Sequence, residues 1–313
     1  MWELVVLARF EALQSMLSSD ERENVQLAVC ELHEVARVDA AISRKATAAS
    51  DCHDTEDALT VAGDNGSAHL ERWKKWRLEG EQIDRLTATV GTAATAALQL
   101  LEARVANLRF FARGKRGVLY AGELRSSDEA VVAKLAASAS ATHSVTLEAQ
   151  WLRVVNRMGL GPKLLDAGSG WFLCERLQGK NVVAFLAQDD DVASPANAVW
   201  LVREMLCQCF AMDLLGVNKE EMTHPHRHVL VHRSREPPTV WRCTFVDFEK
   251  CSSTTKPKNV TQLCQFLSSP RMIGLLQRKR VHVDIPLLRQ RTKRYKHSHC
   301  RSTFGDVMRV FGL

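Results

Sequence analysis

The sequence predicts an α+β fold of two lobes with an N-terminal helical extension. Two observations support this prediction. Residues 109–177 consist of β-branched segments separated by glycines, around a single helical pattern, which is typical of a strand-rich lobe. Residues 178–313 carry mainly the three-and-four spacing of apolar residues that is typical of helices. We therefore expect two lobes with a cleft between them, preceded by helices.

Composition places the chain among soluble globular proteins. Its 313 residues are 46% hydrophobic and 25% charged, which leaves room for one large domain or two of ordinary size. No apolar run reaches the roughly 18 residues of a membrane helix, so no membrane association is expected. The nine cysteines are scattered, and Cys207 and Cys209 fall in a helical pattern. We expect reduced core thiols and a reducing compartment, the cytoplasm or alternatively the nucleus.

Local patterns assign the extension and the first lobe. Residues 1–44 have apolar positions at helical spacing, 45–68 are small, polar and acidic, and 69–108 are rich in Ala, Leu, Glu and Arg. They predict a helical segment, a flexible linker and a long helix. Further on, the pattern predicts a strand pair within 110–124, a strand at 131–135, a helix at 147–158 and strands at 163–167 and 170–177.

In the second lobe we expect a long helix at 196–215, short strands near 228–232 and 239–247, and terminal helices. The terminal segment is strongly basic, because Arg278 to Arg309 contains ten Lys or Arg and two Asp, within a chain of net charge +6. Such a segment favours contact with RNA, a ribosomal particle or an acidic partner, and a solvated helix face is the alternative.

Two features of the first lobe have the chemistry needed to bind phosphates. Gly114 and Gly117 can bend a strand–turn–strand unit so that backbone N–H groups approach phosphate oxygens, and Lys115 adds positive charge. Lys134, in the strand-like sequence V-V-A-K-L, can reach phosphates too. Glu148, fourteen residues later on the predicted helix, is its expected ion-pair partner. A plain hairpin turn and ordinary surface charges are the alternatives.

A candidate metal ligand stands at the end of a predicted buried strand. Asp247 ends the apolar run T-F-V-D-F, and a strand of this kind can deliver one carboxylate to a cleft. An Asp that caps a turn is the alternative. The motif L-L-G-V-N-K-E-E-M-T-H-P-H-R-H-V-L-V ends at Val231, sixteen residues before Asp247.

This motif and five shorter ones, G-K-R-G-V-L-Y, V-V-A-K, E-R-L-Q-G, F-V-D-F-E and K-N-V-T-Q, resemble a group of small archaeal serine/threonine protein kinases related to RIO-type and Bud-type atypical kinases. The resemblance runs from about Phe110 to the C-terminus. It implies a compact protein-kinase-like fold that binds ATP and Mg²⁺ and transfers a phosphoryl group. The ATP-binding residues that it implies are Gly114, Lys115, Gly117, Lys134, Glu148 and, for the adenine, the backbone from Glu175 to Leu177.

The expected catalytic loop departs from the usual kinase pattern, in which Asn follows five residues after the Asp of His-Arg-Asp. Here Glu221, or as a second choice Glu220, would orient the acceptor, since a Glu can accept a hydroxyl proton. His228 stands in place of the Asn and would bind metal beside Asp247, although imidazole is a poorer Mg²⁺ ligand.

Two alternatives to a protein kinase follow from these departures. One is a catalytically impaired pseudokinase that binds RNA or a ribosomal particle. The other is a small-molecule kinase, because the short segment 248–259 leaves little room for a peptide platform. The acceptor, protein or small molecule, stays open.

Overall fold

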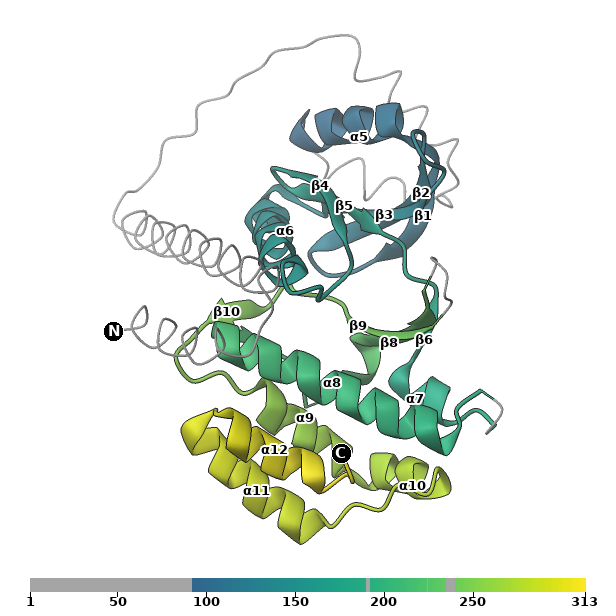
Figure 1. Ribbon diagram of the computed structural model, residues 1–313. Helices are drawn as coiled ribbons and strands as arrows, with labels where there is room; N and C mark the ends of the chain where they lie inside the picture. The colour runs from purple at the N-terminus through teal and green to yellow at the C-terminus, as the bar shows by residue number, and fades with distance from the viewer. Residues whose placement is uncertain (1–91, 190–191, 224, 235–239) are drawn as a thin grey trace. The chain divides into compact units, whose positions relative to one another are not determined.

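The structure is a computed structural model that describes residues 92–189, 192–223, 225–234 and 240–313 (Figure 1). These form two compact units: a sheet unit of residues 92–153 and 163–176, and a helical unit of residues 154–162 and 177–313. Helices combine with antiparallel sheets, so the predicted α+β class is confirmed. The predictions for residues 1–44, 45–68 and the first part of 69–108 lie outside the described residues.

The sheet unit contains one five-stranded antiparallel sheet in the order β1-β2-β3-β5-β4. Its strands are β1 Val105–Arg113, β2 Gly117–Leu124, β3 Ala130–Ala136, β4 Leu164–Gly168 and β5 Trp171–Glu175. Its helices are α5 Thr92–Arg104, a 3-10 turn at Ala139–Ala141 and α6 Thr142–Asn156. The helix that the sequence predicted through residue 108 ends at Arg104, because Val105 already pairs with Leu124 in the sheet.

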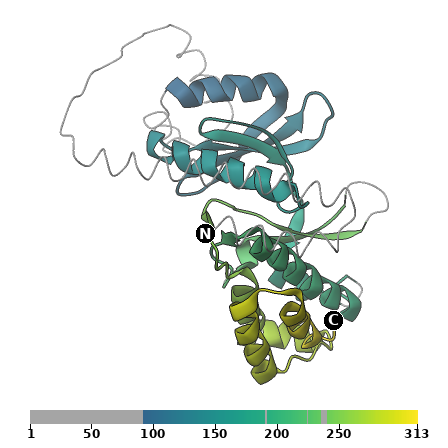
Figure 2. The same cartoon turned by 60° about the vertical axis from the view of Figure 1, so that its left-hand side comes forward.

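Alternation along β3 decides which residues enter the core. Val131, Ala133 and Leu135 are buried and pack with Leu98 and Leu101 of α5, both fully buried. Because successive side chains of a strand point to opposite faces, Lys134 lies on the other face, which α6 covers. Figures 1 and 2 show α5 and α6 on opposite faces of the sheet. Helix α5, which the family resemblance leaves out, is therefore part of the core of this unit.

The helical unit is built around α8, Pro195–Leu215. The Ser194 hydroxyl accepts a hydrogen bond from the Asn197 amide at its start, and Gly216 ends it at a φ of 74°. The predicted helix at 196–215 is thus confirmed. The other helices of this unit are α7 Val182–Leu186, α9 Asn259–Leu267, α10 Pro270–Arg278, α11 Ile285–Ser298 and α12 Arg301–Arg309. Phe210 of α8 stacks on Phe304 of α12, with ring centroids 4.1 Å apart.

Two small sheets complete the helical unit. The first contains β6 Gly179–Asn181, β8 Val229–Arg233 and β9 Trp241–Phe245 in the order β6-β8-β9. The second pairs β7 Val217–Lys219 with β10 Cys251–Ser253. The strands β8 and β9 were expected from the sequence, and the structure shows that they pair antiparallel. The three-residue strands β6, β7 and β10 were not expected, because segments of three residues are too short to show periodicity.

Two further observations bear on the predictions from composition. None of the helices in the described part of the chain is both long and apolar enough to cross a membrane. Cys209 is buried as expected, but Cys207 is exposed, so the prediction that both are core thiols is wrong for Cys207. The two residues differ because positions two apart on a helix face different directions.

Candidate functional site

Lys134 of β3 forms a buried ion pair with Glu148 of α6. The Lys134 Nζ lies 2.5 Å from Glu148 Oε2, and the two residues are only 8% and 3% exposed. The neighbouring Cys174 is also buried, and this burial raises the pKa of its thiol to about 12, with the charges of Glu148 and Glu175 adding to the shift. The expected pair is therefore present, with the ammonium held at one place on the sheet.

Gly117, the first residue of β2, makes room for the Lys134 side chain. A Cβ atom at Gly117 would lie 2.6 Å from Lys134 Cε and 3.0 Å from its Cγ. Gly114 is different, because a Cβ there would meet only the Gly117 oxygen, at 3.6 Å. The Gly114 amide donates to that same oxygen at 2.8 Å and so closes the turn, while Lys115 is exposed. The absence of a side chain at Gly117 thus leaves space for Lys134. Phosphate binding by this turn stays a prediction.

The predicted adenine-binding backbone begins at the end of β5. The Glu175 amide donates to the Lys163 carbonyl at 2.9 Å, and the Arg176 amide donates to the Ala130 carbonyl at 2.9 Å. The Glu175 carboxylate accepts a hydrogen bond from the Lys163 amide at 2.8 Å. The Glu175 and Arg176 amides are thus used by the sheet. Leu177, which is partly buried, is the first of the predicted adenine-binding positions that lies beyond these bonds.

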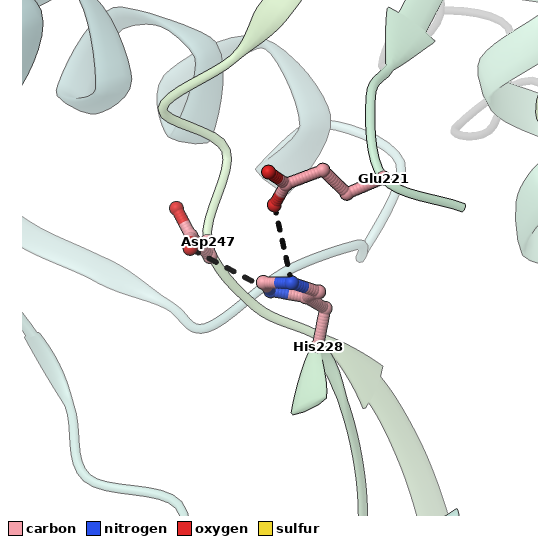
Figure 3. A group of neighbouring side chains, drawn as sticks. All are labelled: Glu221, His228 and Asp247. Carbon is pink, nitrogen blue, oxygen red and sulfur yellow. Dashed lines mark ion pairs between the residues drawn. The ribbon is translucent and has the colours of Figure 1, made fainter. Parts of the chain in front are cut away.

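In the helical unit, three predicted site residues converge on one point (Figure 3). His228 Nε2 lies 3.3 Å from Glu221 Oε2, and His228 Nδ1 lies 3.5 Å from Asp247 Oδ2. Glu221 follows β7, His228 precedes β8 and Asp247 follows β9. The Val246 amide donates to the His228 carbonyl at 2.9 Å, which extends the β8–β9 ladder and sets Asp247 beside the imidazole. We call Glu221, His228 and Asp247 the carboxylate–histidine cluster.

Charges around the cluster act in opposite directions. Burial and then the positive charge of Lys219 lower the pKa of His228, although the flanking carboxylates of Asp247 and Glu221 raise it. The net direction is downward, so the imidazole is neutral at pH 7. A hydrogen bond from Lys250 is the main reason that the pKa of Glu221 is lowered, and this carboxylate is ionised. The cluster therefore presents two acids and one neutral ring nitrogen.

Lys219 is a residue of the candidate site that the sequence did not predict. It is 2% exposed, donates from Nζ to the Asp247 carbonyl at 2.5 Å, and lies 5.1 Å from the centroid of the Phe248 ring. It thereby fixes the backbone at Asp247 and leaves the Asp247 carboxylate directed at His228. Its place in the motif G-V-N-K-E-E was visible, but nothing in the motif indicates a buried ammonium.

The two candidate acids of the loop are placed differently. Glu220 Oε1 accepts a hydrogen bond from Asn218 Nδ2 at 2.7 Å, so this acid is held by its own strand. Glu221 instead faces His228 and is also paired with Lys250. Of the two, only Glu221 joins the cluster.

Strand β7 is tied to the start of α9 by buried polar groups. The Asn259 side chain accepts from the Lys219 amide at 2.8 Å and donates to the Val217 carbonyl at 2.6 Å. Asp213 of α8 in turn accepts from the Asn259 side chain at 2.8 Å and from the Val260 amide at 3.2 Å. These bonds hold the strand from which Glu220 and Glu221 emerge.

The cluster has the donor atoms that a divalent cation needs. One ligand atom from each of Glu221, His228 and Asp247 lies within 4.8 Å of the others. Carboxylate oxygens suit Mg²⁺, so the predicted ion fits two members of the set. His232, four residues after His228, is not a member of this set and bonds through Nε2 to the Thr244 hydroxyl at 2.9 Å.

Comparisons with known proteins give kinases as structural neighbours. No protein-family model matches the chain, and no curated protein matches it. A Rio2 kinase–ADP/Mg²⁺–phosphoaspartate complex from Chaetomium thermophilum is similar over 96% of this chain and 88% of its own, at 11% identity and a TM-score of 0.43. A second solved kinase domain is similar over 49% of this chain and 52% of its own, at 11% identity and a TM-score of 0.37. At these TM-scores a functional conclusion has to come from the side chains of this chain.

Proposed function

We propose that the chain is an ATP-dependent phosphotransferase of the atypical serine/threonine kinase class that its motifs resemble. The observation that carries the proposal is the Lys134–Glu148 pair, buried beneath Gly117. A buried ion pair is expensive to desolvate and contributes little net stability, so its presence favours a role beyond folding. A lysine held on a strand by a helix glutamate is the arrangement that kinases use to contact nucleotide phosphates.

The carboxylate–histidine cluster supplies the second part of the proposal. Asp247 and His228 would hold Mg²⁺, an ion that screens the negative charge of the phosphates when it is bound. Glu221 would orient the acceptor hydroxyl, because an ionised carboxylate can accept its proton. Lys219 keeps Asp247 in place through the backbone.

The proposal is tested by calorimetric titration of the full chain with ATP, with and without Mg²⁺. Lys134→Met combined with Glu148→Leu removes the ammonium without leaving a buried unpaired acid, and should weaken binding by roughly tenfold or more in both conditions. Asp247→Asn should weaken binding only when Mg²⁺ is present. Arg153→Met, an exposed change on α6, is the matched control. Unchanged ATP binding in the double variant would rule the proposal out.

Transfer itself needs a separate measurement. Autophosphorylation with labelled ATP, with and without Mg²⁺, separates an active kinase from a pseudokinase. An active enzyme incorporates label only with the divalent ion, and Glu221→Gln should abolish incorporation while ATP still binds. Binding without any incorporation would favour the pseudokinase.

One observation favours a compact acceptor such as a small molecule. The short segment after Asp247 forms part of a β-sheet, because Cys251, Ser252 and Ser253 of β10 pair with β7. The Thr254 amide then donates to the Gly216 carbonyl at 2.8 Å, which continues the attachment. A segment tied down in this way offers little backbone for docking a peptide.

A second candidate function is binding of RNA or another polyanion through α11. Arg289, Lys293 and Lys296 are exposed and recur at four and three residues, so they share one face of the helix. Another face of the helix packs inward through Leu288 and Tyr295. A stripe of exposed cations on one helix face supports sequence-independent contact with phosphates.

A further inference from the structure

The carboxylate–histidine cluster contains one ligand that Mg²⁺ sites rarely use. Mg²⁺ prefers oxygen ligands in octahedral geometry and keeps several waters. Imidazole nitrogen suits first-row transition metals, and carboxylate suits Mn²⁺ as well as Mg²⁺. In this cluster the nitrogen ligand is central, because its ring faces both acids (Figure 3).

The spacing of the ligand atoms suits an ion better than it suits hydrogen bonds. The 3.3 Å and 3.5 Å separations from the His228 nitrogens to the two acids are at or beyond the usual limit for N–H···O bonds. Ligand atoms within 4.8 Å of one another can all reach a dication at about 2.0–2.2 Å after small side-chain shifts. His228 would bind the ion through one of its two ring nitrogens.

The two lysines near the cluster, Lys219 and Lys250, contact oxygens other than those that face His228. Lys219 is bonded to the backbone carbonyl of Asp247 and not to its carboxylate. Lys250 pairs with Glu221 Oε1, whereas Glu221 Oε2 faces His228. Each acid thus directs one oxygen toward the imidazole while its other contacts hold it in place.

The backbone is also held in an unusual conformation at both acids. Glu221 has a φ of 68° and Asp247 a φ of 64°, in the left-handed region that residues other than glycine seldom adopt. Such conformations persist only where the surroundings enforce them, and they gather at binding and catalytic sites. Here both of them turn a carboxylate toward the same imidazole.

We propose that Glu221, His228 and Asp247 bind a single first-row transition-metal dication, such as Mn²⁺, in preference to Mg²⁺. The inference rests on the proposed function in taking Asp247 and His228 as metal ligands, and it assigns Glu221 to the ion and not to the acceptor alone. Binding of this ion would require no nucleotide, so it can be measured on the nucleotide-free protein.

The test is an electron paramagnetic resonance titration of the nucleotide-free full chain with Mn²⁺, followed by competition with Mg²⁺. One ion should bind per chain, and Mg²⁺ should displace it only at roughly tenfold or greater excess. The bound Mn²⁺ should show nitrogen coupling from an imidazole in electron spin echo spectra. Absence of binding, or bound Mn²⁺ without nitrogen coupling, would overturn the proposal whatever the variants do.

Three variants assign the ligands. His228→Asn should remove the nitrogen coupling and the preference for Mn²⁺, and Glu221→Gln, an exposed change that the fold should tolerate, should weaken Mn²⁺ binding. His232→Asn, on β8 but bonded to Thr244, is the control and should bind as the wild type. Full Mn²⁺ affinity in Glu221→Gln would refute the three-ligand assignment. ATP binding that fails while Mn²⁺ binding persists would instead defeat the proposed function and leave this inference standing.

Discussion

Tyr295 of α11 donates its hydroxyl to Asp213 Oδ2 of α8 at 2.8 Å, across 82 residues of sequence. Asp213 is fully buried and also accepts hydrogen bonds from the backbone amides of Asn259 and Val260 at the start of α9. Burial is the main cause that raises the pKa of Asp213, and the bonds from Tyr295, Val260 and Asn259 oppose it. One carboxylate therefore joins three helices and, through Asn259, the strand that leads to Glu221.

Replacing Asp213 should destabilise the fold. In Asp213→Asn an amide N–H₂ would face the Tyr295 hydroxyl and the Val260 amide, so a buried donor would lose its acceptor. We expect the free energy of unfolding to fall by about 1–3 kcal/mol, and Tyr295→Phe should cost about 1 kcal/mol. Urea unfolding measures both, and Asp128→Asn, an exposed change at a φ of 55° that Asn accepts, is the control. Equal stability of Asp213→Asn and the control would contradict the role of the network.

Gly114 and Gly117, at the two ends of the β1–β2 turn, should respond differently to alanine. In Gly117→Ala the new Cβ displaces the Lys134 side chain from Glu148, whereas in Gly114→Ala it meets only an ordinary contact. We expect Gly117→Ala to lower both stability and ATP affinity, and Gly114→Ala to change neither by more than about 0.5 kcal/mol. Thermal unfolding with and without ATP shows the difference. Two alanine variants with the same behaviour would mean that Lys134 has room to move.

A double-mutant cycle should show that Lys134 and Glu148 are strongly coupled. Lys134→Met alone leaves a buried carboxylate without its cation and should cost about 3–5 kcal/mol. Adding Glu148→Leu should recover most of that loss, because both charges are then gone. Chemical denaturation of the two single variants and the double variant gives the coupling energy. Simple additivity of the two changes would indicate that the pair is no more than a close contact.

Cys300 should react with alkylating reagents at a lower pH than an ordinary thiol. Hydrogen bonds from the Ser302 hydroxyl and then from Thr303 lower the pKa of Cys300 to about 6. The thiolate is the reactive form, so the rate of alkylation by iodoacetamide should rise with pH and reach half its plateau near pH 6. Cys207 is an internal control, because it is also exposed at the surface. Partial burial of its thiol and then the negative charge of Glu204 raise its pKa instead.

Peptide mapping by mass spectrometry follows the two cysteines in one experiment. Ser302→Ala should move the midpoint for Cys300 toward the ordinary thiol value, since it removes the largest contribution. A midpoint for Cys300 near pH 9 in the wild type would show that these hydroxyls do not stabilise the thiolate.

The exposed stripe on α11 should account for polyanion binding. Arg289→Gln, Lys293→Gln and Lys296→Gln together should reduce the slope of log affinity against log salt by about 2 for single-stranded RNA, with ATP binding unchanged. Arg291 and Arg294 are less useful targets, because they lie 3.2 Å and 3.9 Å from Asp306.

The matched control for the stripe removes three exposed charges from the sheet unit, by Arg109→Gln, Arg153→Gln and Lys163→Gln. Fluorescence anisotropy with a generic RNA at several salt concentrations compares the two triple variants. RNA binding that is undetectable at low salt in the wild type would leave the stripe as a solvated surface.

Several features of the molecule followed from sequence alone. The α+β class, the long helix at 196–215 and the two short strands where β8 and β9 lie were predicted, because long or regularly alternating segments carry a strong periodic signal. The pairing of Lys134 with Glu148 was also expected, since a strand and the next helix are neighbours along the chain. Local patterns are informative where the interacting residues belong to consecutive elements.

The tertiary structure alone decided the rest of the candidate site. Lys219 and Asn259 carry no local signal, because their partners lie 28 and 40–46 residues away in the sequence. All three members of the carboxylate–histidine cluster were named from the sequence, but Glu221 was expected to serve the acceptor, and only the structure shows that it lies against His228. A short strand such as β7 is held in place by buried hydrogen bonds from distant helices, so its register, and the direction of the acids that follow it, depend on how those helices pack.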